Sequence, residues 1–250
     1  MIDLLLLERY CNEQLEAVRF DDYCPNGIQV EGRRQVRKIM SGVTACQALI
    51  EQAVEWGADL LLVHHGFFWK GEAAPIRGMK GRRIGTLLKH DISLLAYHLP
   101  LDAHPIWGNN RQLAELCGFP DPQATASGRG LLWRSTLPQP IAADELGQRL
   151  SRSLQREALH IAAAGETIRQ IGWCTGAAHG LIEEAAALGL DAYISGEIAE
   201  ATVHAARELN IHYFAAGHHA TERLGVQSLG RHLAEAFSLE YRFVDIENPV

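Results

Sequence analysis

Two stretches of the chain share one order of apolar and polar positions. Residues 39–43 and 171–175 are β-rich runs that end in small residues, and a helical pattern with apolar residues at i, i+3 and i+4 follows each. A continuous apolar run comes next, at 60–63 in the first stretch and at 192–194 in the second. Continuous apolarity is typical of strands that are covered on both faces. The pattern predicts an α/β fold of layered sheets covered by helices.

The likeness of the two stretches extends to residue identity. Aligned without a gap at an offset of 132, residues 36–65 and 168–197 are identical at nine of 30 positions. The identical pairs include Gly57 with Gly189 and Asp59 with Asp191. A shared strand–helix–strand pattern does not require a glycine and an aspartate at the same turn, so we infer an internal duplication.

The repeat continues beyond a change in length. Apolar runs at 92–97 and 211–216 predict matching strands, and each precedes a His-x-x-x-carboxylate segment. The first copy carries about twelve extra residues around 67–83. We therefore predict related α/β halves that form one functional unit. The expected divisions are an N-terminal half (1–124), a short connecting segment (125–165) and a C-terminal half (166–250).

Local signals place some element ends. Thr44 is the expected N-cap of the first repeat helix, and Gly57 and Gly189 are the expected C-cap glycines. Between the copies, the pattern predicts a strand and then a helix from Asp144.

The composition is that of an ordinary globular chain. The sequence has 250 residues, 47% of them hydrophobic and 21% charged, which argues against intrinsic disorder. A net charge of −7 disfavours a nucleic-acid partner. The chain has no apolar run of transmembrane length and no secretory leader pattern, which predicts a cytoplasmic protein without a membrane partner. Five cysteines without a C-x-x-C pair predict neither a disulfide framework nor a cysteine zinc site.

Three polar clusters each follow a predicted strand. They are His64-His65, His98 with Asp102, and His218-His219 with Glu222. The carboxyl ends of parallel strands meet at one edge of a sheet, where ligand sites collect. A single histidine at a strand end is more often a surface residue, but packing gives no reason for three such clusters. We therefore predict a metal site at the strand carboxyl ends, between the two halves.

The residue types indicate the kind of site. Neighbouring imidazoles at the end of a strand can both point forward, which suits two metal ions, and two carboxylates can neutralise and bridge them. Imidazole with carboxylate favours Zn, Fe, Mn, Co or Ni over Mg or Ca. His98 and His219 are expected to transfer protons, to support the ligands or to face the substrate. The predicted metal ligands are His64, His65, Asp102, His218 and Glu222.

Other polar residues carry weaker predictions. His104, His204 and Glu197 are interpreted as surface or helix residues in preference to residues lining the same cleft. The basic, aromatic segment 67–83 is interpreted as a solvated loop with an aromatic plug or as a subunit contact, with phosphate recruitment as the alternative. The sequence contains no Walker A, G-x-G-x-x-G or G-x-S-x-G motif.

Five sequence blocks form a familiar combination: SGVTA (41–45), VHHGFFWKG (63–71), HLPLDAHPIWGNN (98–110), SGE (195–197) and AAGHHATERLG (215–225). Together they resemble the motifs of the Nif-three-like family of dinuclear-metal proteins, whose members are often labelled GTP cyclohydrolase 1 type 2 homologues. The resemblance implies two related α/β halves, a two-metal centre with Glu222 as the bridging ligand, and a toroidal homohexamer whose metal sites face an internal cavity. The short middle segment implies that the large extra domain of some members is absent.

Two functions of different classes follow. The first is a metal-dependent hydrolase acting on a small nucleotide-like or cyclic amide substrate, because the sequence offers no other nucleophile. The alternative is a non-catalytic protein that binds or delivers metal, or a scaffold. A third hypothesis, DNA or transcription-factor binding, is disfavoured by the acidic charge.

Overall fold

The computed structural model of the chain describes residues 1–250, and it divides into two compact units. Unit 1 comprises residues 1–108 and 225–247, and unit 2 comprises residues 109–224 and 248–250. These units are defined by packing. The halves expected from the repeat, with their boundary near residue 125, are defined by sequence similarity and stay a prediction.

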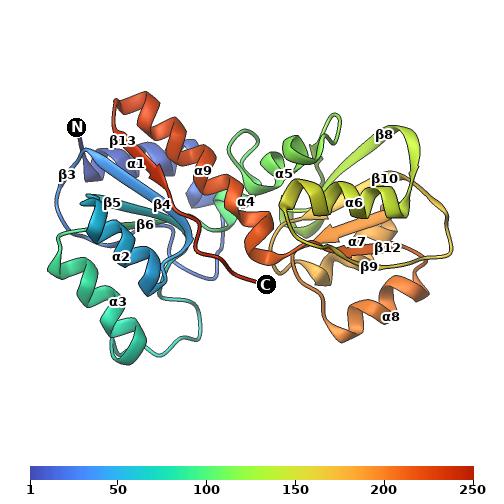
Figure 1. The fold of residues 1–250 in the computed structure, drawn as a ribbon, viewed down its shortest axis with the longest axis horizontal. Helices are drawn as coiled ribbons and strands as arrows, with labels where there is room; N and C mark the ends of the chain where they lie inside the picture. The colour runs from blue at the N-terminus through green and yellow to red at the C-terminus, as the bar shows by residue number, and fades with distance from the viewer. The chain divides into compact units, whose positions relative to one another are not determined.

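Unit 1 is built on a five-stranded sheet with the order β13-β4-β5-β6-β2, in which only β2 is antiparallel to its neighbour. Figure 1 labels four of these strands, β4, β5, β6 and β13. Its strands are β2 (Gly27–Val30), β4 (Lys38–Thr44), β5 (Leu60–His65), β6 (Ser93–Ala96) and β13 (Glu240–Phe243), and a small two-stranded sheet pairs β1 (Ile2–Asp3) with β3 (Gln35–Val36). Its helices are α1 (Leu4–Gln14), η1 (Ala17–Arg19), α2 (Gln47–Trp56), α3 (Gly78–Lys89) and α4 (Leu99–Ala103).

Helices cover both faces of this sheet, which explains the continuous apolar run of β5. Leu61 and Val63 pack in one core cluster with α2 and α3. Leu60 and Leu62 point the other way, into a second cluster with α1 and with α9 (His218–Phe237), a helix that begins in unit 2 and continues in unit 1. Alternate residues of one strand therefore enter two cores, as expected for a three-layer α/β arrangement.

Unit 2 repeats the three-layer plan around a six-stranded sheet with the order β7-β8-β10-β11-β12-β9. Its strands are β7 (Gln123–Ala124), β8 (Trp133–Ala142), β9 (Leu159–Ile161), β10 (Thr167–Cys174), β11 (Ala192–Ser195) and β12 (His212–Ala215). Its helices are α5 (Asn109–Cys117), η2 (Ser127–Gly130), α6 (Ala143–Leu154), η3 (His179–Leu181), α7 (Ile182–Ala187) and α8 (Glu200–Glu208). Ala192 and Ile194 of β11 join a core with α5 and α6, whereas Tyr193 joins the core with α7 and α8.

The matching stretches of sequence form matching structures. β4 and β5 are parallel with Ile39 opposite Leu60, and β10 and β11 are parallel with Ile171 opposite Ala192. The shared aspartates also accept equivalent backbone hydrogen bonds. One carboxylate oxygen of Asp59 accepts the backbone amides of residues 37 and 38 at 2.8 and 3.0 Å, and Asp191 accepts those of residues 169 and 170 at 2.8 and 2.7 Å. These likenesses support the duplication hypothesis.

Most predicted elements are present, and one predicted cap is wrong. Gly57 ends α2 with φ 70° and ψ 43°, the left-handed conformation expected of a C-cap glycine. Thr44, the expected N-cap, is instead the last residue of β4, and α2 begins three residues later after Cys46. Its hydroxyl contacts a histidine instead of the helix amides.

The helices were also compared with the requirements of a membrane span. None of them combines the length and the apolar character that crossing a bilayer requires.

The aspartate of the first repeat gives a stability prediction. Asp59→Ala removes the acceptor of two part-buried amides and the partner of Arg33, so it should lower the free energy of unfolding by about 2 kcal/mol. Urea unfolding followed by circular dichroism measures this change. Glu55→Ala, at an exposed position of α2, is the control and should stay within about 0.5 kcal/mol of the unmodified protein. An equally small effect of Asp59→Ala would contradict the assignment.

A histidine pair in unit 2 predicts a dependence of stability on pH. His160 of β9 lies 3.0 Å from His212 of β12 and stacks on Phe214, with ring centroids 4.4 Å apart. Burial lowers the pKa of His160, and the neighbouring His212 lowers it further. As the pH falls below the ordinary histidine pKa, the unfolded chain therefore binds a proton that the folded chain resists, and stability is lost. His160→Phe keeps the stacked ring without the titration. The midpoint of thermal unfolding of this variant should fall less between pH 7 and pH 5 than that of the unmodified protein. An equal fall in the two midpoints would contradict the prediction.

Candidate metal centre

The two adjacent histidines of unit 1 converge at the end of β5, as the sequence predicts. Their ring centroids are 4.6 Å apart. Nδ1 of His64 donates a hydrogen bond to the backbone carbonyl of Tyr97, at 2.9 Å, just beyond β6. Nδ1 of His65 shares a hydrogen bond of 3.1 Å with the hydroxyl of Thr44, at the end of β4. The strands on both sides of β5 thus fix the two imidazoles.

The segment after β6 adds a carboxylate and a third imidazole. Asp102 lies on the short helix α4, is buried, and places Oδ1 3.5 Å from Nε2 of His64. His98 precedes this helix and donates from Nδ1 to the carboxylate of Asp22 at 2.7 Å. One ring nitrogen each of His64, His65 and His98 lies within 4.8 Å of the other two. We call His64, His65, His98 and Asp102 the unit 1 cluster.

Asp22 is held by several donors besides His98. Its carboxylate also accepts the backbone amides of Tyr23 and Leu99 and the side-chain amide of Asn26. Burial raises the pKa of Asp22, but the hydrogen bond and charge of His98 and these donors outweigh burial and lower it. A charged carboxylate therefore fixes the orientation of His98.

The unit 2 cluster comprises His218, Glu222 and Glu197. His218 and Glu222 lie on the first turn of α9, four residues apart, with Nε2 and Oε2 separated by 2.9 Å, so the prediction that they share one face is confirmed. Nδ1 of His218 donates to the carboxylate of Glu197 at 2.6 Å. Burial lowers the pKa of His218, but the two glutamates outweigh burial and raise it to about 9. The two carboxylates concentrate negative charge at this imidazole, where a cation would be stabilised.

A glycine turn lets this cluster form. Gly176 follows β10 with φ +70°, and a Cβ atom there would lie 2.0 Å from Oε1 of Glu222. Its amide donates to the hydroxyl of Thr221 on α9, at 3.1 Å. Only glycine therefore allows the first turn of α9 to approach the end of β10 so closely.

The remaining sequence candidates have other surroundings. His219 is buried at the start of α9, and its backbone amide donates to the carbonyl of Val250. His204 lies on the surface of α8 with 63% of its side chain exposed, as predicted. His104 stacks on Trp107 and accepts the amides of residues 106 and 107 at Nδ1, which is a structural role. The interpretation of Glu197 as a surface or helix residue is wrong, because its carboxylate orients His218.

The segment 67–83 divides into parts with different roles. Phe67 is buried in the core with α2 and α3, and Phe68 packs partly against it, so an aromatic plug is present. Trp69 instead contacts the rings of His65 and His98. Residues 78–83 are not loop but the first turns of α3.

The donor set fits divalent metal ions. Each of His64, His65 and His218 has its Nδ1 engaged by a protein group, so Nε2 is the ring nitrogen that could bind a metal ion. Fixing the second nitrogen of an imidazole in this way is the usual arrangement of metal-ligating histidines. Carboxylates stand beside Nε2 in both clusters. The chain therefore has clustered histidine and carboxylate side chains that could bind metal ions.

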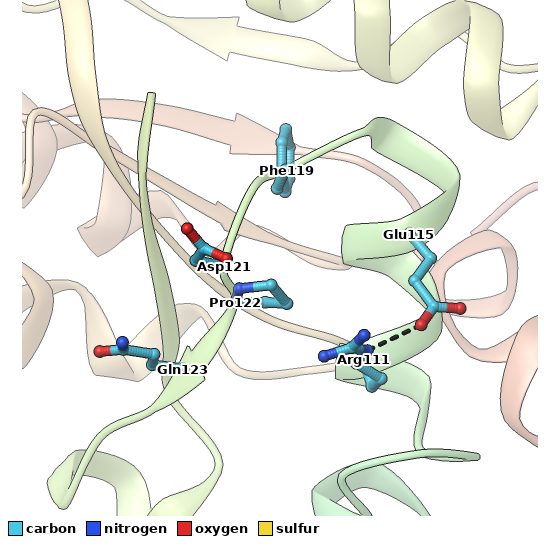
Figure 2. Close-up of a pocket in the computed structure, with 6 residues that line it drawn as sticks. All are labelled: Arg111, Glu115, Phe119, Asp121, Pro122 and Gln123. Atoms are coloured by element: carbon cyan, nitrogen blue, oxygen red, sulfur yellow. Dashed lines mark hydrogen bonds and ion pairs between the residues drawn. The ribbon is translucent and has the colours of Figure 1, made fainter. Parts of the chain in front are cut away.

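Unit 2 also has a surface pocket that belongs to neither cluster (Figure 2). It encloses about 460 Å³, and the ion pair between Arg111 and Glu115 forms part of its wall. Its lining residues are Arg111, Glu115, Phe119, Asp121, Pro122 and Gln123. None of the predicted site residues lines this pocket, so we assign it no role in the candidate centre.

Comparison with known proteins identifies the family. The model of the Duf34/NIF3 (NGG1p interacting factor 3) family matches residues 4–249. The chain belongs to the Duf34/NIF3 family. It is 53% identical over 249 residues to a protein of Allochromatium vinosum named "GTP cyclohydrolase 1 type 2 homolog", covering 100% of this chain and 98% of the relative. The family resemblance seen in the sequence motifs is confirmed.

Solved structures of the family share the fold. A structural-genomics protein, ybgI, described as of unknown function, superposes with a TM-score of 0.95 at 46% identity, with 100% of each chain covered. A protein of Thermus thermophilus superposes with a TM-score of 0.91 at 32% identity, again with 100% of each chain covered. The α/β architecture described above is thus that of the Duf34/NIF3 family.

The contact between Glu197 and His218 gives a prediction. Glu197→Ala removes the acceptor of Nδ1 of His218, so metal affinity should fall by about 10- to 100-fold, as is typical when such a supporting carboxylate is lost. Competition with a fluorescent chelator measures the affinity. The matched control is Glu200→Ala on α8, where the glutamate side chain is 94% exposed, and it should leave the affinity unchanged. Equal affinities for the two variants would show that Glu197 does not support a ligand.

Proposed function

We propose that the chain is a dinuclear metal-dependent hydrolase that acts on a small nucleotide-like or cyclic amide substrate. In this proposal His64, His65 and Asp102 of unit 1 and His218 and Glu222 of unit 2 would hold two divalent transition ions (Zn, Fe, Mn, Co or Ni). The observation that carries the proposal is the fixed orientation of the three imidazoles, each with Nδ1 engaged by a protein group, together with the carboxylates beside Nε2 of His64 and of His218. A histidine that only packs or stays solvated does not require such a partner.

In this proposal the residues of the site have separate roles in proton transfer and charge balance. Bound divalent ions would supply Lewis-acid polarisation of the substrate and activation of water. Asp22 fixes the tautomer of His98 through Nδ1, so that Nε2 of His98 is the atom that takes up or releases a proton. His219 is the second candidate for this proton transfer. Asp102 and Glu222, both buried, balance the positive charge that the site would hold.

The substrate class rests on the relatives. Several curated relatives, at 48–53% identity, carry the name "GTP cyclohydrolase 1 type 2 homolog". A cyclohydrolase opens a ring by hydrolysis, which agrees with the site chemistry proposed above. We also propose a homohexamer and a cytoplasmic location, with no nucleic-acid or membrane partner, as the family resemblance and the composition imply.

The experiment that tests this proposal is a count of metal ions per chain. Protein purified without chelator or nickel affinity resin should contain about two transition ions per chain by elemental mass spectrometry. His64→Ala and Glu222→Ala should lose them, whereas His204→Ala, on the exposed surface of α8, should keep them. If each cluster binds on its own, His64→Ala would leave the unit 2 ion in place, and the single shared centre would be wrong.

A measurement of turnover then distinguishes a hydrolase from a protein that only binds or delivers metal. The ion found by the count is used to screen hydrolysis of nucleotides and cyclic amides, and Glu222→Gln should abolish any activity while the fold survives. Two ions without turnover, released readily to a chelator, would favour a protein that binds or delivers metal. Fewer than about half an ion per chain, unchanged in the variants, would contradict the metal centre itself.

A further inference from the structure

Two aromatic side chains of unit 1, Tyr23 and Trp69, contact the same imidazole. The ring centroids of Trp69 and His98 are 5.0 Å apart with an interplanar angle of 84°, and those of Tyr23 and His98 are 6.3 Å apart at 64°. Trp69 also lies 5.8 Å from the ring of His65. Rings from two separate loops therefore stand beside the proposed proton-transfer residue. We call Tyr23 and Trp69 the aromatic pair.

Polar contacts of the backbone hold the aromatic pair in place. Phe68 has φ +65°, a left-handed conformation that is uncommon for a residue other than glycine. The carboxylate of Glu72 accepts the amides of Phe68 and Trp69 at 3.0 and 3.3 Å, and the indole N–H of Trp69 donates to the carbonyl of Gly66 at 3.3 Å. The amide of Lys70 donates to the carbonyl of Tyr23 at 2.7 Å, which ties the two loops together.

The aromatic pair does not belong to the hydrophobic core. Phe67, two residues before Trp69, is only 4% exposed and fills the core, whereas Tyr23 is 51% exposed and Trp69 is half-buried. Core packing therefore does not explain why large aromatic rings stand beside imidazoles at an accessible position. Aromatic walls with a few fixed polar groups are characteristic of sites for small molecules.

We propose that Tyr23 and Trp69 form the wall that receives the planar face of a nitrogen heteroaromatic ring, of the nucleobase type, in the substrate. This inference rests on the proposed function, because the ring belongs to the substrate of that site. Aromatic side chains stack on any base, since every base has a π-face, so the pair selects for a planar ring and not for one particular base. The fixed loop places such a ring next to His98.

Binding of nucleoside monophosphates tests this inference. Titration calorimetry compares GMP, AMP, CMP and UMP with ribose 5-phosphate, which carries the same phosphate without a base. At least one nucleotide should bind about tenfold or more tightly than ribose 5-phosphate. Trp69→Ala and Tyr23→Ala should each remove most of this preference and leave the affinity for ribose 5-phosphate unchanged. Trp69→Phe should restore most of it, because a planar ring is kept.

A matched tryptophan provides the control. Trp56 is also half-buried but ends α2, before the amino end of β5, so Trp56→Ala should not change the preference. Because the readout compares two ligands with the same phosphate, it is valid whether or not the protein holds metal or shows turnover. The inference is overturned if no nucleotide is preferred to ribose 5-phosphate, or if Tyr23→Ala and Trp69→Ala behave like Trp56→Ala. Tyr23→Ala, at an exposed position, decides the case if Trp69→Ala does not fold.

Discussion

A neutral imidazole carries one proton, so the group that binds one ring nitrogen decides what the other can do. In this protein, groups at the ends of neighbouring strands bind one ring nitrogen of each of His64, His65 and His218. β5 ends in His64 and His65, and the strands on either side supply the partners, a hydroxyl at the end of β4 and a carbonyl just beyond β6. In unit 2, a carboxylate just beyond β11 does the same for His218. Parallel register brings the strand ends together, and the groups at the strand ends then orient the imidazoles.

The same register explains how much of the site could be predicted from the sequence. Continuous apolar runs locate strands that are buried on both faces, and polar residues after such runs must lie at the carboxyl edge. This reasoning places His64, His65, His98 and Asp102 at one edge of unit 1, and the four-residue spacing of His218 and Glu222 places them on one helix face. Each of these inferences needs only local periodicity, and the structure agrees with them.

The supporting residues could not be predicted, because each is defined by a partner that is distant in sequence. Thr44 has the sequence context of a helix N-cap, but its hydroxyl contacts His65, its partner across the β4–β5 register. Asp22 lies in a loop with no periodic signal, and only the folded chain brings it to His98. Glu197 offered one usable signal: it comes just after the end of β11, and the other clusters also lie at or just after a strand end.

The strands and the loops of unit 1 contribute different parts of the candidate site. The strand ends beside β5 fix His64 and His65 through a backbone carbonyl and a short side chain, and these two contacts follow from the register of the sheet. The aromatic rings beside His98 come from two loops, which can vary without disturbing that register. Phe68 illustrates the separation: its left-handed backbone lies between Phe67, which fills the core, and Trp69, which turns toward the histidines. A change at Trp69 would therefore act on the proposed ligand contact, whereas a change at Phe67 would act on the stability of the fold.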